Sequence, residues 1–487
     1  MPAREAHRER ARKAEHEIAG HGAAVPRGLD VAPGRAPPYG RFGWMFPRLE
    51  ACDVSEEAVD ALVKRMRRPP AGEEENFAVP AGFTYLGQFI DHDITFDPVS
   101  SLDQDIDPHA VVNFRTPRFD LDSVYGSGPK VQPYLYDWSE SEQPGTRLLV
   151  GRGAAKGVDD LPRNHHGRAL IGDPRNDEHV IVAQLHLLFI KFHNAVVDRL
   201  SSKVEDPFRE AQQIVRWHYQ WIVVREFLPK VVGQSMAQDV LPRRRGRAGP
   251  AVRLEYFKWE TEPFIPVEFS GAAYRFGHSM VRDSYGLKRL PRSGSGKPAK
   301  PIFPDLAGHT WLPRELVIDW ERFFLLGDDV RGLQRSFRID PSIAQPLFDL
   351  PDHEGQLPRR NLQRGNRLGL PSGQAVAHAM ERPKLSPEDL RLDGLEPGVR
   401  DKLIEATPLW YYLLCEAAKA GGRDAPPEPG AHLGPVGGRI VAEVLVGLLA
   451  GDPNSYLSEE PSWKPKLGTR GDFTMADLIN FVRSSEA

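Results

Sequence analysis

The stretch that decides the fold is residues 86–98, LGQFIDHDITFDP. If it is helical, Gln88, Asp91 and His92 project to one side, because residues three and four apart share a helix face. Asp93 then points about 100° away from His92. One turn would present a polar trio to a pocket and send a carboxylate to a different ligand behind it. An acidic helix end with a capped histidine has the same sequence, so the segment needs partners elsewhere in the chain.

The composition excludes several classes of protein. The chain has 487 residues, 63 of them basic and 67 acidic, and a formal net charge of -4, so no general field attracts nucleic acid. A short basic run at residues 243–247 is typical of a solvated loop. The two cysteines, Cys52 and Cys415, are too few and too far apart for a disulfide scaffold or a cysteine-rich metal site.

The N-terminal residues alternate in charge and lack the apolar core of a signal peptide. We therefore expect a tail over residues 1–34 and one domain over residues 35–487. The apolar segment 439–450 is too short to cross a bilayer and contains Arg439 and Glu443. We expect a soluble protein with no membrane span, located in the cytoplasm or exported without a signal peptide; its oligomeric state stays open.

Apolar periodicity predicts a mainly α protein. Residues at helical spacing predict helices over residues 179–200, 211–227, 408–420 and 436–450, and Pro229 is expected to end the second. Alternating strand patterns are few, and 44 prolines and 44 glycines punctuate long stretches. The segments that carry chemistry spread from residue 88 to 364, so we expect a single large helical domain with long irregular loops and little β structure.

A second polar segment, TPRFDLDSVYG at residues 116–126, offers oxygen donors at every second residue. Thr116, Arg118, Asp120 and Asp122 face one way if the loop is extended, with Arg118 contributing its carbonyl. Hard oxygen donors at this spacing suit calcium, which takes six to eight of them. An aspartate-rich turn before a hairpin remains the alternative.

Three further segments have ordinary structural explanations when each is taken alone: residues 174–178 (PRNDE), 273–281 (AYRFGHSMV) and 360–371 (RNLQRGNRLGLP). In the first, Asp177 could cap the following helix and Arg175 could form a surface pair with Glu178. In the second, His278 could be a satisfied core histidine. The third could be a basic loop.

Taken together and in this order, the five segments resemble the animal haem peroxidases, the family of myeloperoxidase and lactoperoxidase within the peroxidase-cyclooxygenase superfamily. The resemblance runs over about residues 35–457. It implies a helical domain that binds haem b and calcium and reduces hydrogen peroxide through a ferryl haem. It also implies small anionic or phenolic electron donors and a part in the response to oxidative stress.

The resemblance assigns a role to residues of each segment. It makes His92 the distal base, Arg175 its cationic partner and Gln88 a hydrogen-bonding residue of the distal pocket. It makes His278 the iron ligand and Asn361 the acceptor of its ring N–H. The remaining positions are Arg275 and Arg364 near the haem propionates, Asp91 and Glu178 as sites of ester bonds to haem, and Asp93, Thr116, Arg118, Asp120 and Asp122 as calcium ligands.

The expected chemistry explains these residue types. A neutral imidazole can take a proton from peroxide and return it to the leaving oxygen. An arginine, charged at any working pH, stabilises the negative charge that develops as the O–O bond breaks. Asn361 is a neutral partner, so it orients His278 without giving it the anionic character that a carboxylate would. Calcium between Asp93 and the Thr116 loop would hold the turn that bears His92.

Two positions depart from the family pattern. Residue 179 is His, where myeloperoxidase has the methionine of a third, sulfonium link to haem. That link cannot form, so bromide, iodide, thiocyanate or phenols are expected donors rather than chloride. Asp122 stands where the mammalian enzymes carry serine, which adds a negative charge to the calcium site and predicts tighter binding. The absence of their dense disulfides and propeptide indicates a compact, microbial-type relative.

Two other functions stay open. A fatty-acid oxygenase of the same superfamily uses a tyrosyl radical three residues before the proximal histidine. That position is Arg275 here, and Tyr274 lies one residue earlier. A catalytically decayed haem-binding or adhesive protein should have lost the distal pair, whereas His92 and Arg175 are both present.

Overall fold

The structure is a computed structural model. It describes residues 40–69, 75–96, 112–113, 115–139, 143–200, 203–241, 252–260, 262–290, 298–350, 355–419 and 428–486. The expected tail over residues 1–34 and the basic run at 243–247 lie outside these ranges.

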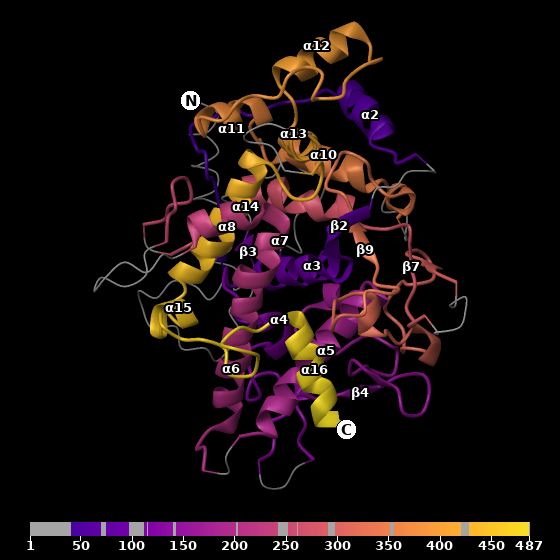
Figure 1. The fold of residues 1–487 in the computed structure, drawn as a ribbon, viewed down its shortest axis with the longest axis vertical. Coiled ribbons are helices and arrows are strands. Elements are labelled where there is room, and N and C mark those ends of the chain that lie inside the picture. The colour runs from indigo at the N-terminus through magenta and orange to yellow at the C-terminus, as the bar shows by residue number, and fades with distance from the viewer. Residues whose placement is uncertain are drawn as a thin grey trace, which may run out of the picture.

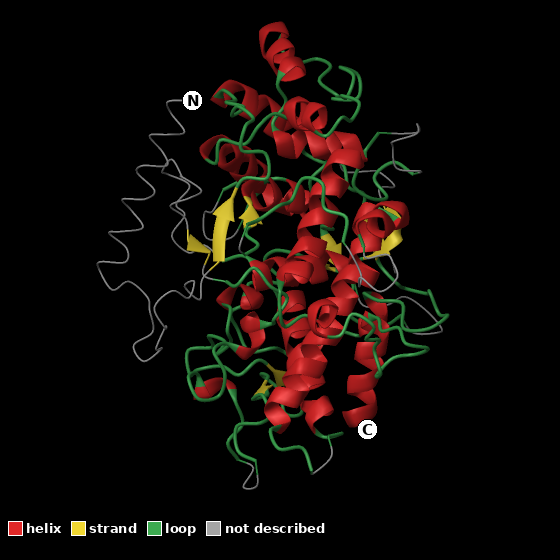
Figure 2. Ribbon diagram, turned by 90° about the vertical axis from the view of Figure 1, so that its left-hand side faces the viewer, coloured by secondary structure: helices red, strands yellow, loops and turns green. Residues whose placement is uncertain are grey.

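The described chain forms a mainly helical single domain, as the sequence predicts, with long loops between the helices (Figure 2). The α-helices are α2 (Glu56–Arg65), α3 (Gly82–Ile94), α4 (Asp122–Tyr125), α5 (Val180–Val197), α6 (Pro207–Trp221), α7 (Leu228–Val232), α8 (Gln234–Val240), α9 (Val267–Gly271), α10 (Leu357–Arg367), α11 (Gly373–Ala379), α12 (Pro397–Glu405), α13 (Leu409–Ala417), α14 (Pro435–Gly451), α15 (Tyr456–Glu459) and α16 (Met475–Glu486). The 3-10 turns are η1 (Pro133–Leu135), η2 (Pro174–Asp177), η5 (Ala273–Met280), η6 (Arg314–Leu316), η7 (Trp320–Arg322) and η8 (Gln345–Phe348).

The strands are short, and β2 and β9 pack on the central helix α3. β1 (Gly40–Gly43) pairs antiparallel with β3 (Val112–Asn113) and parallel with β6 (Ile265–Pro266). The other pairs are antiparallel: β2 (Glu75–Pro80) with β9 (Arg335–Phe337), β4 (Gly151–Arg152) with β5 (Asp159–Asp160), and β7 (Ser284–Tyr285) with β8 (Lys300–Pro301). The pairs of β1 and β2 join distant segments of the chain, whereas the β4–β5 and β7–β8 pairs are local.

Helix α3 lies near the middle of the molecule, with α10 and α13 on one side and α5 and α16 on the other (Figure 1). It packs directly on α5 and on η5. Its apolar residues Phe83, Leu86, Phe89 and Ile90 are buried, which fixes its rotation and leaves its polar residues for defined neighbours.

Helix α5 confirms the strongest periodic prediction. Its length and apolar composition would suit a membrane span, but 89% of the window is buried inside the fold. The helix begins at His179, whose Nδ1 accepts a hydrogen bond from the backbone N–H of Ile181 at 3.2 Å. Asp177, predicted as a possible cap, instead binds Arg163 through both carboxylate oxygens, at 2.6 and 2.8 Å.

The prediction that Pro229 ends a helix is wrong. Helix α6 continues through a π turn, η3 (Ile222–Phe227), into α7, which contains Pro229 in its first turn. Proline has no backbone donor, and it is tolerated here beside a π turn, where the N–H of Leu228 bonds to the carbonyl of Val223 and the regular α pattern is already interrupted. The chain turns away only at Gly233, whose φ of 83° is readily adopted by glycine.

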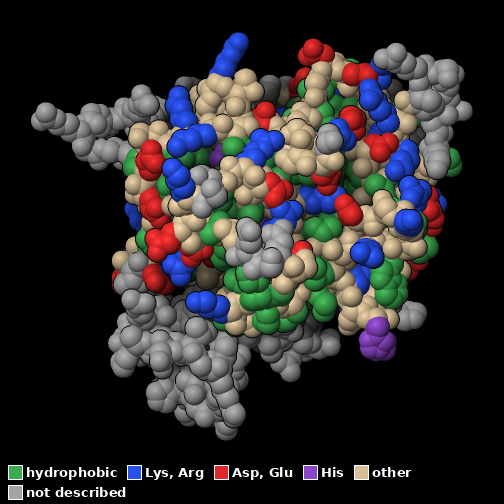
Figure 3. All heavy atoms as spheres, turned by 90° about the horizontal axis from the view of Figure 1, so that it is seen from below, with side chains coloured by type: hydrophobic (Ala, Val, Ile, Leu, Met, Phe, Trp, Pro, Cys, Tyr) green, Lys and Arg blue, Asp and Glu red, His purple; other side chains and the backbone are tan. Residues whose placement is uncertain are grey.

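The mixed charge of the surface and the two unpaired cysteines agree with what the composition predicts. On the face in Figure 3, basic and acidic side chains are interspersed rather than gathered by sign. Cys52 and Cys415 are both free and buried.

Candidate functional site

The end of α3 distributes its polar side chains as the sequence predicts. Gln88 and Asp91 are half-buried, His92 is 5% exposed, and Asp93 is fully buried on the other side of the turn. The hydroxyl of Thr95 donates to the backbone carbonyl of Asp91 at 2.9 Å and contacts its carboxylate at 3.1 Å. The helix therefore ends immediately after the polar residues and fixes their directions.

A hydrogen bond to the turn η2 holds the ring of His92. Its Nδ1 lies 2.8 Å from Oδ1 of Asn176, a buried residue of η2. In this arrangement Nδ1 donates its hydrogen and Nε2 keeps its lone pair. Burial and the positive charge of Arg175 lower the pKa of His92 from 6.5 to about 4. The imidazole is therefore neutral at ordinary pH.

Arg175 binds the backbone at the end of α3 rather than the imidazole of His92. Its Nη2 donates to the carbonyls of His92, at 3.1 Å, and Thr95. Its guanidinium carbon lies 4.7 Å from the centre of the Phe96 ring. Within the described part of the chain, no acceptor is bonded to Nη1 of Arg175, which leaves that nitrogen for a ligand.

Asp173, rather than Glu178, pairs with Arg175 and holds it in place. The surface pair between Arg175 and Glu178, which the sequence left as an alternative, is not formed. Arg175 bonds to Asp173 through Nε at 3.1 Å and Nη2 at 2.8 Å, whereas Glu178 is exposed. Arg115 bonds to the same carboxylate at 2.7 and 3.2 Å. Against the effect of burial, these two arginines hold the pKa of Asp173 below its usual range.

The second wall of the candidate site, which bears His278, comes from η5 and α10; the first wall bears His92. His278 Nδ1 lies 2.8 Å from the amide of Asn361, so the predicted pair is present. The segment of Asn361, which could have been a basic loop, is helix α10, because Pro358, Asn361 and Leu362 fall on one buried face. The amide nitrogen faces the ring, so Asn361 donates rather than accepts. A half-turn of the amide would exchange its two ends, which coordination of iron by His278 requires.

Buried positive charge surrounds His278. Burial and the charges of Arg275, Arg360 and Arg364 lower the pKa of His278 to about 3. Burial and Arg364 lower the pKa of Arg275 to about 10. Nε of Arg275 is buried with no hydrogen-bond partner in the described structure. The cluster therefore favours an anionic group beside His278.

These features fit haem. A Cβ added to Gly277 would meet no atom within 4 Å, so there is open space beside His278. Two propionates would neutralise the arginines, and the imidazole is a suitable iron ligand. The charges of Asp91 and Arg175 also act on Arg275, which places the two walls within electrostatic reach of one another. Asp91 is half-buried and Glu178 exposed, and their ester bonds to haem stay a prediction.

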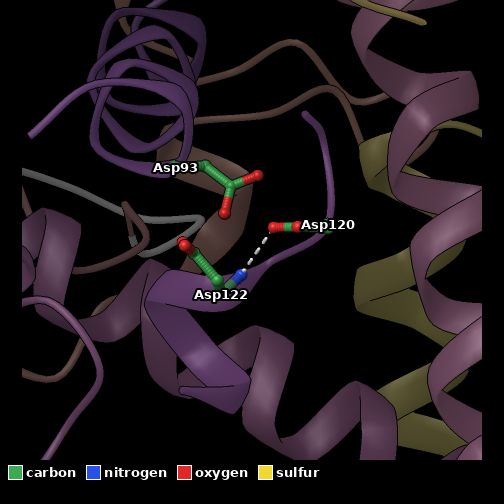
Figure 4. A group of neighbouring side chains, drawn as sticks. All are labelled: Asp93, Asp120 and Asp122. Atoms are coloured by element: carbon green, nitrogen blue, oxygen red, sulfur yellow. Dashed lines mark hydrogen bonds between the residues drawn. The ribbon is translucent and has the colours of Figure 1, made fainter. Parts of the chain in front are cut away.

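The aspartates of the second segment meet Asp93, as predicted (Figure 4). Carboxylate oxygens of Asp93, Asp120 and Asp122 all lie within 4.8 Å of one another. Thr116 Oγ1 donates to Asp120 at 2.7 Å, whereas the side chain of Arg118 lies 3.8 Å from Asp452. The loop is not extended throughout: Leu121 has a φ of 56° and α4 begins at Asp122, so the chain bends around the cluster.

The cluster has the electrostatics of a cation site. Burial and Asp120 raise the pKa of Asp93 to about 8 and that of Asp122 well above its usual value. Arg115 lies 3.4 Å from Asp122, which leaves three carboxylates facing one arginine. A divalent cation with a preference for oxygen would offset this repulsion, and the donor set fits calcium.

Sequence reasoning missed four residues that hold the distal side. Arg115 and Asp173 fix Arg175, and Asn176 fixes His92. His186 of α5 contacts Asn176 at 3.0 Å. The available signal was a histidine, His186, in the apolar run of α5, but its partner could not be read from the sequence because the contact with η2 forms only in the fold.

Comparison with known proteins now decides the family. The family model described as animal haem peroxidase matches residues 100–391, which is more than half of the chain. The chain belongs to the animal haem peroxidase family. This confirms the resemblance carried by the five segments.

The curated relatives that this chain matches are distant and longer. It is 25% identical to thyroid peroxidase of Homo sapiens over 380 residues, covering 71% of this chain and 38% of that protein. It is 29% identical to chorion peroxidase of Drosophila melanogaster over 270 residues, covering 52% of this chain and 31% of that protein. The chain thus spans less than two fifths of the length of these relatives.

Solved structures confirm the fold. Peroxidase A from Dictyostelium discoideum is similar with a TM-score of 0.62 at 18% identity, covering 92% of this chain and 93% of that one. A fatty acid alpha-dioxygenase from Oryza sativa is similar with a TM-score of 0.58 at 15% identity, covering 90% and 78%. At these identities the likeness concerns the fold alone.

Proposed function

We propose that this chain is a haem peroxidase that reduces hydrogen peroxide and oxidises small donors. The observation that carries the proposal is the bond between His92 Nδ1 and Asn176, which leaves Nε2 of a neutral imidazole as a base. Membership of the animal haem peroxidase family supports an oxidoreductase that binds haem.

Each of these residues has a separate role in the cleavage of peroxide. Haem, held through His278, supplies the electrons that break the O–O bond. Nε2 of His92 takes the proton of peroxide and returns it to the leaving oxygen, which departs as water. Arg175 offers Nη1 to the charge that develops on that oxygen, and Gln88 adds a hydrogen bond from the same helix face. Asn361, with its amide turned, orients His278.

The proposed donors are bromide, iodide, thiocyanate and phenols rather than chloride. His179 stacks on Tyr85, with ring centres 5.2 Å apart and planes at 14°, and caps α5 with its Nδ1. A side chain engaged in this way adds no third link to haem. Ester links through Asp91 and Glu178, and calcium at Asp93, Thr116, Arg118, Asp120 and Asp122, belong to the same proposal.

The proposal is tested with haem-loaded protein. Near-stoichiometric peroxide should change the ferric Soret band, and His92→Ala should slow that change by about 100-fold or more while leaving haem bound. A panel of chloride, bromide, iodide, thiocyanate and a phenol at several pH values identifies the donor. A fully loaded protein whose spectrum does not respond to peroxide would overturn the enzyme assignment.

A fatty-acid oxygenase is the second candidate, because its fold is shared and a buried tyrosine precedes His278. Tyr274 stacks on Phe269, with ring centres 4.7 Å apart, and its buried hydroxyl has no hydrogen-bond partner in the described structure. The position three residues before His278 is Arg275, so we expect no oxygen uptake with a long-chain fatty acid. Oxygen uptake that Tyr274→Phe abolishes would favour the oxygenase instead.

A further inference from the structure

Three buried side chains from three elements form a continuous hydrogen-bonded chain behind the candidate base. His92 of α3 contacts Oδ1 of Asn176 at 2.8 Å, and Nδ2 of Asn176 contacts Nδ1 of His186 at 3.0 Å. Asn176 and His186 are fully buried, so bulk water cannot replace either bond. The two histidines are therefore coupled through one amide.

An amide has one accepting end and one donating end, so its orientation dictates the state of both rings. With Oδ1 toward His92, that ring carries its hydrogen on Nδ1 and leaves Nε2 free as a base. His186 then accepts at Nδ1 and carries its hydrogen on Nε2. Reversal of the amide would move the hydrogen of His92 to Nε2 and remove the base.

The surroundings of His186 favour the first orientation. Burial lowers the pKa of His186 to about 3, so this ring is neutral. Its Nε2 is buried with no hydrogen-bond partner in the described structure, and the ring lies edge-to-face with Phe89, 6.1 Å between centres. The bond from Nδ2 of Asn176 to Nδ1 of His186 leaves the hydrogen of this ring on Nε2.

We propose that Asn176 and His186 are positioning residues that hold His92 in the tautomer whose Nε2 is a base. This inference rests on the proposed function, because it assigns the two residues to the peroxide reaction. It makes His186, a buried histidine of α5, part of the selection of the distal tautomer. Neither residue touches peroxide or haem in this role.

The direct test reads the tautomer without haem. Ring nitrogen-15 NMR of histidine-labelled, haem-free protein distinguishes protonated from unprotonated Nδ1 and Nε2, and His92→Gln assigns the His92 signals. We expect protonated Nδ1 in the wild type. His186→Phe removes the acceptor and should give a mixture of the two His92 tautomers. His186→Gln retains an acceptor and should restore the wild-type state.

Asn176→Asp gives an isosteric variant with the opposite demand on His186. Both ends of the carboxylate accept, so His92 should keep its Nδ1 hydrogen while His186 moves its hydrogen from Nε2 to Nδ1. An unchanged His186 signal in this variant would overturn the coupling. The Asn176→Asp variant keeps the packing volume of the side chain, so it still decides the coupling if His186→Phe does not fold.

The functional reading uses the haem-loaded protein. His186→Phe should slow the reaction with peroxide by roughly tenfold to 100-fold, as loss of an orienting partner does, while the KM for the electron donor stays constant. The matched control is His193→Gln, because His193 is equally buried on α5 but bonds to Tyr125 and Thr146 instead.

Equal loss of rate in the His193 control, or an unchanged His92 tautomer in His186→Phe, would overturn the inference. Failure of the proposed function has a different signature. A wild-type protein that does not react with peroxide refutes the peroxidase assignment, while the nitrogen signals still decide whether the buried chain sets the tautomer.

Discussion

His92 owes its chemical state to two neighbours, Asn176 and Arg175, and to its burial. Asn176 determines which ring nitrogen carries the hydrogen, while burial and Arg175 oppose a second proton. A histidine in water would be half-protonated near pH 6.5, whereas the pKa of His92 is lowered to about 4. At the scale of a single residue, the fold extends the pH range over which this base is available.

This shift predicts the acid limb of the peroxide reaction. The reactive form is the neutral ring, which exists above the folded pKa, so the rate should stay level from pH 7 to about 5 and halve near pH 4. Arg175→Gln removes a positive charge, so the pKa of His92 should rise and the limb should move toward higher pH. Stopped-flow rates on haem-loaded protein across this range measure both.

The ferric Soret spectrum at each pH is the control for retained haem. A wild-type limb centred near pH 6.5 would contradict the burial of His92. A limb that stays fixed in Arg175→Gln would show that the charge of Arg175 does not reach the ring.

At the scale of elements, the short turn η2 holds the distal side through ion pairs that its N-cap residue, Asp173, makes with Arg115 and Arg175. Asp173 is fully buried between Arg115 and Arg175, and removal of its charge takes a buried ionic partner from both cations. Asp173→Asn should therefore lower the free energy of unfolding by about 3 kcal/mol. Chemical denaturation of the haem-free protein measures this loss.

The control is Asp159→Asn, which removes a half-exposed partner of Lys191. Surface pairs contribute about 0–1 kcal/mol, so this variant should be nearly as stable as the wild type. Equal stability of both variants would mean that the Asp173 network does not hold η2.

The loop before α4 and the end of α3 should be joined by calcium. Without a cation, burial and Asp120 raise the pKa of Asp93 to about 8, so below that pH Asp93 carries a proton that calcium must displace. Calcium binding should release protons at pH 7, and affinity should rise as the pH increases toward 8. Titration calorimetry in buffers of different ionisation enthalpy measures the protons released.

Asp93→Asn provides the comparison, since it has no carboxyl proton to lose. It should bind calcium at least tenfold more weakly and release fewer protons. Heat that is independent of the buffer in the wild type would show that Asp93 is already ionised, against the effect of its burial.

The sequence predicted elements better than it predicted their partners. Helices α5, α6, α13 and α14 follow from apolar periodicity, because their apolar residues are buried in the core. The end at Pro229 was wrong because a π turn carries the chain past it. Asp173, Asn176 and His186 could not be assigned because their roles come from contacts across a fold. The resemblance supplied His92 and His278. Physical reasoning alone left His92 as a capped histidine at an acidic helix end and His278 as a core histidine.

At the scale of the whole molecule, the candidate haem site joins two distant parts of the chain. The distal wall comes from α3 and η2, and the proximal wall from η5 and α10. Burial and, after it, the charge of Arg364 lower the pKa of Arg275 in the proximal wall. The fold therefore carries a cost in free energy that an anionic cofactor would relieve.

This cost predicts opposite effects of one substitution in the two states of the protein. Arg275→Gln removes a buried cation from the cluster, so the haem-free protein should unfold at the same temperature or higher. The same variant loses a charged partner for a propionate, so its haem affinity should fall by about tenfold or more. Thermal unfolding with and without haem, together with haem titration, measures both. Arg359→Gln is the control, because Arg359 lies on α10 but pairs with Glu56 and Asp60 at the surface. A destabilised haem-free protein with unchanged haem affinity would mean that Arg275 serves the protein core rather than the cofactor.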